Sequence, residues 1–185
     1  MPVTATPRTA TPTGTPSATP AVTQSPTVTG TPGAAGANAL ANPSFDLAGT
    51  PNWHSPWAFA VAGTARGTVA RDTGQIGPFS ARVDITATDV SSPWNLQFYQ
   101  VNLPVTAGSP VTISFLAKAS KGRPIGVAAS GSSFYMPNVN LSTAWQQYSF
   151  TFTPSVSGTA ALAFNFGAAD GSVWLDAVSF SASSP

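Results

Sequence analysis

Three segments of the chain alternate apolar and polar residues with a period of two, as β-strands do when they bury one face. The apolar positions of these segments are Val111, Ile113, Phe115 and Ala117, then Tyr148, Phe150 and Phe152, then Leu162, Phe164 and Phe166. No segment keeps a helical period over about three turns. Because a strand with one apolar face must pack on an opposing layer, the alternation predicts an all-β fold.

Turn-forming residues divide the chain after Asn42 into short predicted strands. The breakers are Gly77-Pro78, Ser92-Pro93, Ala107-Gly108, Lys121-Gly122, Pro154 and Asp170-Gly171. The strands are expected near residues 58–62, 66–71, 80–87, 94–103, 110–119, 124–130, 145–153, 160–167 and 172–181. A series of short strands like this predicts a β-sandwich of two antiparallel sheets.

Residues 2–33 are dominated by threonine and proline, and Arg8 is the only charged residue among them. Proline fixes φ and removes backbone donors, and the tract has little apolar area to offset the entropy lost on ordering. We therefore expect an extended, Thr/Pro-rich linker or arm over residues 1–37, with a disordered tail as the open alternative, and a β-sandwich module over residues 38–185. Linkers of this kind typically join modules of secreted proteins. The sequence thus predicts an extracellular protein with a catalytic or surface-anchoring module as a partner in the same parent chain.

The composition excludes several kinds of partner and activity. Charged residues make up 7% of the chain and the net charge is +1, which gives no electrostatic basis for binding nucleic acid. There is no cysteine, and no apolar run approaches the roughly 20 residues of a membrane span. All six acids are aspartates and the chain has one histidine. Neither the carboxylate pair of a glycoside hydrolase nor a nucleophile motif is evident, so we expect no enzyme.

Residues 94–100 predict a strand whose two faces differ in chemistry. Alternation assigns to the core Trp94, Leu96 and Phe98. It assigns to the opposite face Asn95, Gln97 and Tyr99. Amides hydrogen-bond hydroxyl groups and a ring covers the C–H face of a pyranose, so the second face is suited to a sugar. Gln100 is in phase with Leu96 and Phe98, so its side chain should point toward the core. Only a β-bulge would bring it onto the face of Gln97.

Six motifs follow one another along residues 40–181. They are Asn42-Pro43-Ser44-Phe45-Asp46 with Asn52-Trp53, Gly77-Pro78-Phe79-Ser80-Ala81-Arg82-Val83, Trp94 with Gln97 and Gln100, and the segments 111–120, 141–153 and 173–179. Their order resembles carbohydrate-binding modules of the family 4, 9, 16 and 22 type. The resemblance implies a galactose-binding-like jelly-roll sandwich. It also implies a non-catalytic module that binds a neutral polysaccharide, of the β-glucan or xylan type, on a sandwich face.

Further candidate binding residues come from loops and from other strands. Trp57 follows a proline-broken stretch and could stack on a sugar, with burial as the open alternative. Tyr135 lies in a predicted aromatic loop over residues 134–138, and its alternative is packing against the sheet edge. Gln147 and Asn165 alternate with the apolar positions of their strands, so their side chains should point away from the core. They are therefore candidate hydrogen-bonding residues.

The resemblance also implies a structural calcium ion, because family members often hold one with an early acid, a closing acid and nearby carbonyls. The matching residues are Asp46 and Asp176. Asp46 is shorter than the usual glutamate, and Ala177 replaces the second acid of an aspartate pair. The alternative for each aspartate is a solvated or turn-capping role.

A different class of function fits the low charge and the long arm. The chain would then be a structural subunit of an extracellular surface layer or filament. It would self-associate through the sandwich, and the Thr/Pro arm would add an extended segment to a neighbour's sheet.

Overall fold

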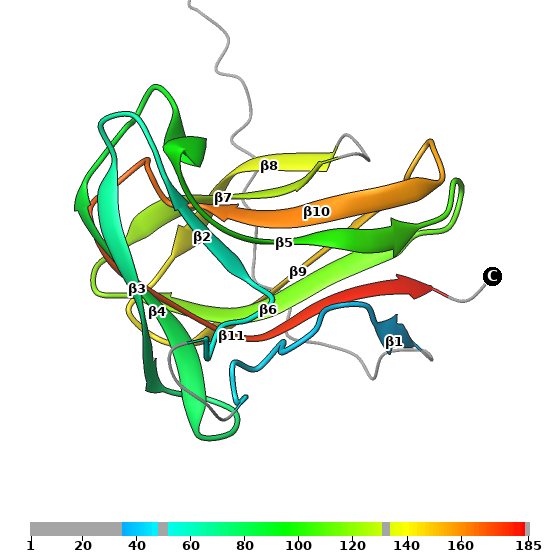
Figure 1. Cartoon of the computed structure of the whole chain (residues 1–185), viewed down its shortest axis with the longest axis horizontal. Coiled ribbons are helices and arrows are strands. Elements are labelled where there is room, and N and C mark those ends of the chain that lie inside the picture. Colours follow the sequence, from blue (N-terminus) through cyan, green and yellow to red (C-terminus); the bar gives the residue numbers. More distant parts are fainter. Residues whose placement is uncertain (1–34, 48–51, 131–133, 184–185) are drawn as a thin grey trace, which may run out of the picture.

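The computed structural model describes residues 35–47, 52–130 and 134–183 of the 185-residue chain. These residues form two antiparallel sheets packed face to face, which confirms the predicted all-β sandwich (Figure 1). Successive strands repeatedly pass from one sheet to the other, as in a jelly roll. Among the described residues no helix is long and apolar enough to cross a membrane.

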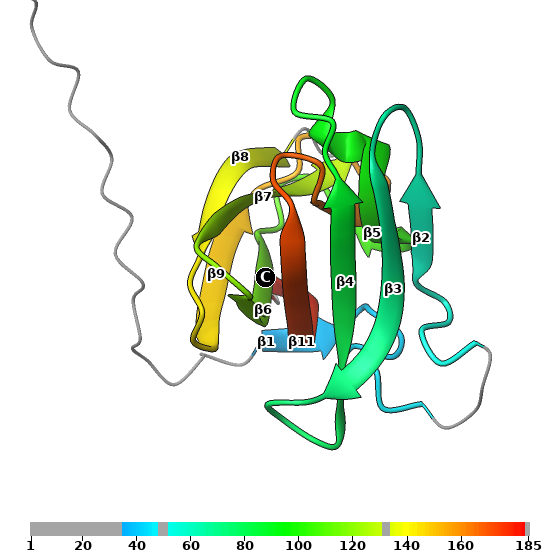
Figure 2. The ribbon, with the colours of Figure 1, turned by 90° about the vertical axis from the view of Figure 1, so that its left-hand side faces the viewer.

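The six-stranded sheet has the order β3-β4-β11-β6-β9, and β1 pairs with β11. Its strands are β1 (Ala35–Asn38), β3 (Arg66–Thr73), β4 (Phe79–Ala87), β6 (Val111–Ala119), β9 (Gln146–Phe152) and β11 (Gly171–Ser183). Figure 2 shows β3, β4 and β11 from the end of the sandwich, with β9 at the far edge of the same sheet.

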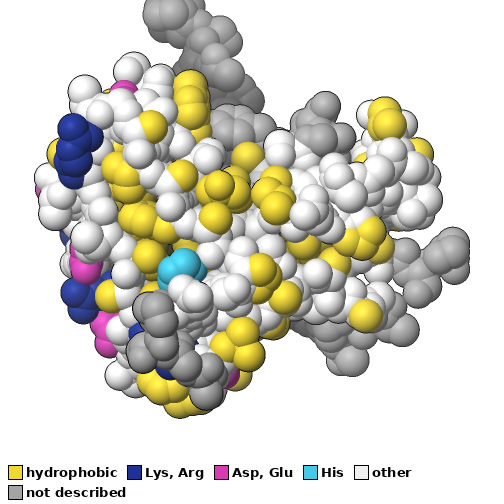
Figure 3. All heavy atoms as spheres, in the orientation of Figure 1, with side chains coloured by type: hydrophobic (Ala, Val, Ile, Leu, Met, Phe, Trp, Pro, Cys, Tyr) yellow, Lys and Arg dark blue, Asp and Glu magenta, His cyan; other side chains and the backbone are white. Residues whose placement is uncertain are grey.

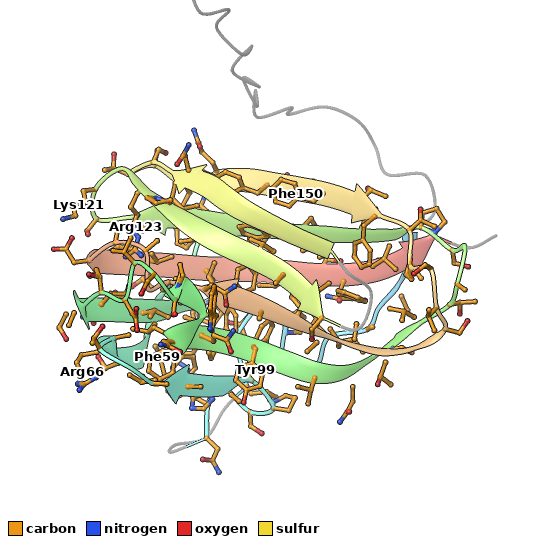
Figure 4. The ribbon with its side chains drawn as sticks, turned by 90° about the horizontal axis from the view of Figure 1, so that it is seen from above. Phe59, Arg66, Tyr99, Lys121, Arg123 and Phe150 are labelled. Carbon is orange, nitrogen blue, oxygen red and sulfur yellow. The ribbon has the colours of Figure 1, made fainter. Side chains whose placement is uncertain are left out.

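The five-stranded sheet has the order β2-β5-β10-β7-β8. Its strands are β2 (Ala58–Val61), β5 (Leu96–Val105), β7 (Arg123–Ser130), β8 (Phe134–Leu141) and β10 (Gly158–Asn165). A 3-10 turn, η1 (Pro93–Asn95), leads into β5. Figure 4 looks onto this sheet from above.

The period-two stripes form the core between the sheets. The apolar positions of β6 are buried, and the Phe115 ring meets Phe164 of the other sheet edge-on, with centroids 5.0 Å apart. Complete burial of a large apolar side chain stabilises a fold by about 1.5–3 kcal/mol. The stripe of β9 is only partly buried because this strand has a sheet neighbour on one side, and Figure 4 shows Phe150 at that edge.

Two strands were not predicted from the sequence. β1 pairs with β11, so the sandwich already includes Ala35–Asn38, part of which was expected in the arm. The predicted aromatic loop at residues 134–138 is wrong, because these residues begin β8. β8 is an edge strand, and an edge tolerates Pro137, whose missing N–H would break a central ladder.

Gln100 hydrogen-bonds the segment that follows β1, at Ala41, to β5. Its side chain is 5% exposed and bonds both backbone groups of Ala41: the Ala41 N–H donates to Oε1 at 2.8 Å, and Nε2 donates to the Ala41 carbonyl at 2.9 Å. The register with β10 does shift, but after Gln100, where Asn102 has a φ of 63°. The bulge therefore leaves Gln100 on the core side, in a structural role.

Candidate functional site

Two rows of side chains cross the outer face of the five-stranded sheet. Within β5, Leu96 and Phe98 are fully buried, whereas Gln97 and Tyr99 point outward and are half-buried. Antiparallel partners share a face, so the register extends each outward residue into a row across the sheet. The Tyr99 row is Ala58, Tyr99, Ala163 and Ala128. The amide row is Ala60, Gln97, Asn165 and Gly126.

The Tyr99 row places one aromatic ring among methyl groups. Ala58 lies beside Tyr99 on one side and Ala163 on the other, so neither immediate neighbour in the row has a large side chain that could cover the ring. Tyr135 lies opposite Ala128 in β8, but its side chain is outside the part that the structure describes. The row is therefore a flat strip with a half-exposed ring, which is a surface that a sugar ring can cover.

The amide row contains a hydrogen-bonded pair. Gln97 Nε2 donates to Asn165 Oδ1 at 2.9 Å, and Asn165 is 2% exposed. Gly126 leaves room for this pair, because a Cβ there would lie 3.2 Å from the Asn165 Cβ. Gln97 Oε1 accepts no hydrogen bond from a described residue, so it can accept one from a ligand hydroxyl. Gln97 and Asn165, which the sequence predicts as separate candidates, are therefore hydrogen-bonded to each other.

Trp94 and Asn95 lie in η1 and not in the strand, which corrects both predictions for them. Proline at position 93 has no N–H for a ladder, and β5 begins only at Leu96. Trp94 is therefore 52% exposed instead of buried. Asn95 does not share the face of Gln97: its Nδ2 donates to Asp89 Oδ2 at 2.7 Å, and this bond lowers the pKa of Asp89.

Backbone hydrogen bonds hold η1 where β5 begins and β10 ends, close to Gln97 and Asn165 of the amide row. Gly167 N–H donates to the Pro93 carbonyl at 2.9 Å, and Phe166 N–H donates to the Leu96 carbonyl at 2.8 Å. A Cβ on Gly167 would lie 2.8 Å from the Pro93 oxygen, so glycine permits this close approach. Trp94 is thus an exposed aromatic residue on a well-anchored turn.

Two other predicted binding residues lie elsewhere in the fold. Trp57 is 2% exposed, and its ring stacks on Phe98 at 5.1 Å with an interplanar angle of 19°. It belongs to the core and cannot stack on a sugar. Gln147 is exposed, but it lies in β9 of the six-stranded sheet, opposite Leu116. Alternation placed it correctly on an outer face, but that face belongs to the other sheet.

The two rows carry no charged side chain. In Figure 3, the charged side chains in view gather mainly at the end of the molecule where β3 and β4 lie. These two rows therefore offer neither a counter-ion for an anionic ligand nor a carboxylate pair for catalysis.

Sequence reasoning missed Arg123, which supports the loop beyond the amide row. This side chain is 3% exposed and donates to the carbonyls of Phe166 at 2.7 Å, Asp170 at 3.2 Å and Gly171 at 3.4 Å. Burial lowers the pKa of Arg123 to about 10. These three carbonyls are more than forty residues away in sequence, so no local pattern reveals the contacts.

The predicted calcium ligands, Asp46 and Asp176, both contact the loop that joins β3 to β4. Asp176 is fully buried. Burial raises its pKa, with a smaller contribution from the charge of Asp46. The two acids therefore lie in one region of the fold, well separated in sequence.

Comparison with known proteins identifies the family. The model of the CBM_4_9 family, a carbohydrate binding domain, matches residues 37–171. A solved family 4 module ("CBM4 structure and function") is 28% identical with a TM-score of 0.60, and the alignment covers 77% of this chain and 99% of that one. No curated protein matches the chain.

Two further structures share the fold at lower identity. The second N-terminal cellulose-binding domain of β-1,4-glucanase C from Cellulomonas fimi is 20% identical, with a TM-score of 0.57 and coverage of 80% and 95%. The CBM22-1 xylan-binding domain of Xyn10C from Paenibacillus barcinonensis is 16% identical, with a TM-score of 0.53 and coverage of 80% and 96%. With a family match over most of its length, the chain belongs to the CBM_4_9 family of non-catalytic carbohydrate-binding domains.

Proposed function

We propose that the module binds a neutral polysaccharide, of the β-glucan or xylan type, on the outer face of the five-stranded sheet. The observation that supports this most is the Tyr99 row, where a half-exposed ring stands between alanines next to the Gln97–Asn165 pair. The glycan would run across the strands, with a sugar stacked on Tyr99 and a hydroxyl donating to Gln97 Oε1. Trp94 would add a second aromatic contact at the end of the face.

The choice of a neutral glycan follows from the absence of charge in both rows, and the choice of class follows from the similar structures, which bind cellulose and xylan. Affinity electrophoresis in gels that contain soluble β-glucan, xylan or polygalacturonate tests whether the module binds a neutral glycan of this class. We expect retardation by at least one of the two neutral polymers and none by the polyanion. Retardation by polygalacturonate alone, or by no polymer, would refute the proposal.

Replacing Gln97 by alanine should weaken glycan binding, because it removes the Oε1 acceptor and leaves Asn165 Oδ1 without its donor. A hydrogen bond is worth about 0.5–1.5 kcal/mol, so we expect a loss of about two- to twelvefold in affinity. Gln147→Ala is the matched control, since it removes an exposed glutamine from the outer face of the other sheet. Calorimetry should show wild-type affinity for the control. Equal losses in both variants would argue against this face.

We further propose that the Thr/Pro-rich tract tethers the module to a catalytic or anchoring module of a secreted parent protein. The tract is nearly uncharged and rich in proline, as flexible or semi-rigid spacers are. A tether raises the local concentration of a weak glycan binder near its target. Self-association through the arm stays a prediction, because residues 1–34 lie outside the described residues.

A further inference from the structure

Four backbone N–H groups point at the two aspartates that the resemblance assigns to calcium. Asp176 Oδ2 accepts hydrogen bonds from Gln75 and Ile76, each at 2.8 Å, and its Oδ1 accepts one from Ala177 at 2.6 Å. Asp46 Oδ1 accepts one from Phe79 at 3.1 Å. Three of these donors belong to residues 74–79, which we call the 74–79 loop.

This set of donors does not fit a calcium ion. Calcium takes about six to eight oxygen ligands, and each N–H directed at a carboxylate oxygen occupies one of that oxygen's two lone pairs, so the two N–H groups on Asp176 Oδ2 leave it none for a cation. Three such groups surround the Asp176 carboxylate. Within the described residues, no group of three or more acidic, histidine or cysteine side chains comes together. The N–H groups reduce the cost of burying the Asp176 charge, which a metal ion would otherwise do.

The backbone of the 74–79 loop also lies close against Asp46. Gly77 has a φ of +71°, and a Cβ built on it would lie 2.5 Å from Asp46 Oδ2. Glycine therefore meets two requirements here, the left-handed conformation and the close approach. The contacts join three distant parts of the chain: the segment after β1, the β3–β4 connection and β11.

We propose that the 74–79 loop is an amide cradle that holds Asp46 and Asp176 in place of a metal ion. The consequence is a sandwich whose stability does not depend on divalent cations. The family resemblance leads to the opposite expectation, a structural calcium ion bound by the same two residues.

The test compares wild-type protein with Asp46→Asn and Asp46→Ala. Asparagine keeps the Oδ1 acceptor for the Phe79 N–H and removes one of two neighbouring negative charges, whereas alanine removes the acceptor as well. Differential scanning calorimetry should give the wild type the same Tm in excess chelator and in excess CaCl2. Asp46→Asn should melt no lower than the wild type, and Asp46→Ala should melt below Asp46→Asn.

Calorimetric titration of chelator-treated wild-type protein with CaCl2 should show no saturable heat. Saturable calcium binding, with a Tm that rises with calcium in the wild type but not in Asp46→Asn, would overturn the proposal. A Tm for Asp46→Asn as low as that for Asp46→Ala would also overturn it, because the amide oxygen would then fail to replace the carboxylate.

Discussion

Replacement of Arg123 by methionine should lower the free energy of unfolding by about 3 kcal/mol. Methionine fills much of the same volume but donates no hydrogen bonds, so the carbonyls of Phe166, Asp170 and Gly171 lose their partner. An unpaired buried polar group costs about 1–3 kcal/mol, and the exposed position of Asp170 lets its carbonyl regain water. The loop between β10 and β11 would lose its main attachment to β7.

Urea unfolding measures this loss, with Lys121→Met as the control. Lys121 lies in the same region and pairs with Asp170 at 2.8 Å, but both side chains are more than half exposed. A surface ion pair is worth about 0–1 kcal/mol, so the control should unfold almost like the wild type. Equal losses for the two variants would show that Arg123 contributes no more than a surface charge.

The effect of Arg123 should not vary with pH near neutrality. Burial lowers its pKa to about 10, below the value in the unfolded chain, so the residue is protonated in both states at neutral pH. Only above about pH 10, where the folded state releases the proton first, would its contribution to stability change, and stability would then rise with pH.

Tyr99→Ala should reduce affinity for the bound glycan about tenfold or more. Among the row's described side chains, the Tyr99 ring is the one large apolar group, and its neighbours are alanines that cannot replace it. Loss of about 1.4 kcal/mol corresponds to a factor of ten in affinity, and an aromatic contact plus its buried area is worth at least this much. The fold should tolerate the change, because Tyr99 points away from the core.

Calorimetry with the glycan that retards the protein most gives the affinities, and the melting temperature checks the fold. Tyr99→Phe, which keeps the ring and removes the hydroxyl, is the matched control and should retain most of the affinity. An unchanged affinity for Tyr99→Ala would refute the role of this residue.

The sequence predicted the sandwich well because burial in a strand is a local, period-two pattern. The stripes of β6 and β10 are buried as expected, and the alternation of Leu96 to Phe98 correctly left Gln97 and Tyr99 on the outer face. Alternation cannot show which sheet a strand joins. For this reason the pattern makes both Gln147 and Asn165 candidates for an outer face, although the two residues lie on different sheets.

The remaining differences arise from local breaks and from distant contacts. Pro93 starts a 3-10 turn where a strand was expected, and this exposes Trp94 and moves Asn95 off the face. Trp57 is buried through its contact with Phe98, which lies 41 residues further along the chain. Arg123 donates to the Phe166 carbonyl, 43 residues away in sequence. Neither contact leaves a periodic signal in the chain.

Chemical-shift mapping can locate the bound glycan on the outer face of the five-stranded sheet. Amide spectra of the labelled protein would be recorded during titration with soluble cello- and xylo-oligosaccharides. We expect the largest shifts along the two rows, at residues 58–60, 97–99, 126–128 and 163–165, with smaller shifts at η1. Saturable shifts confined to the outer face of the six-stranded sheet, such as those at β6 and β9, would show that the glycan does not bind the two rows.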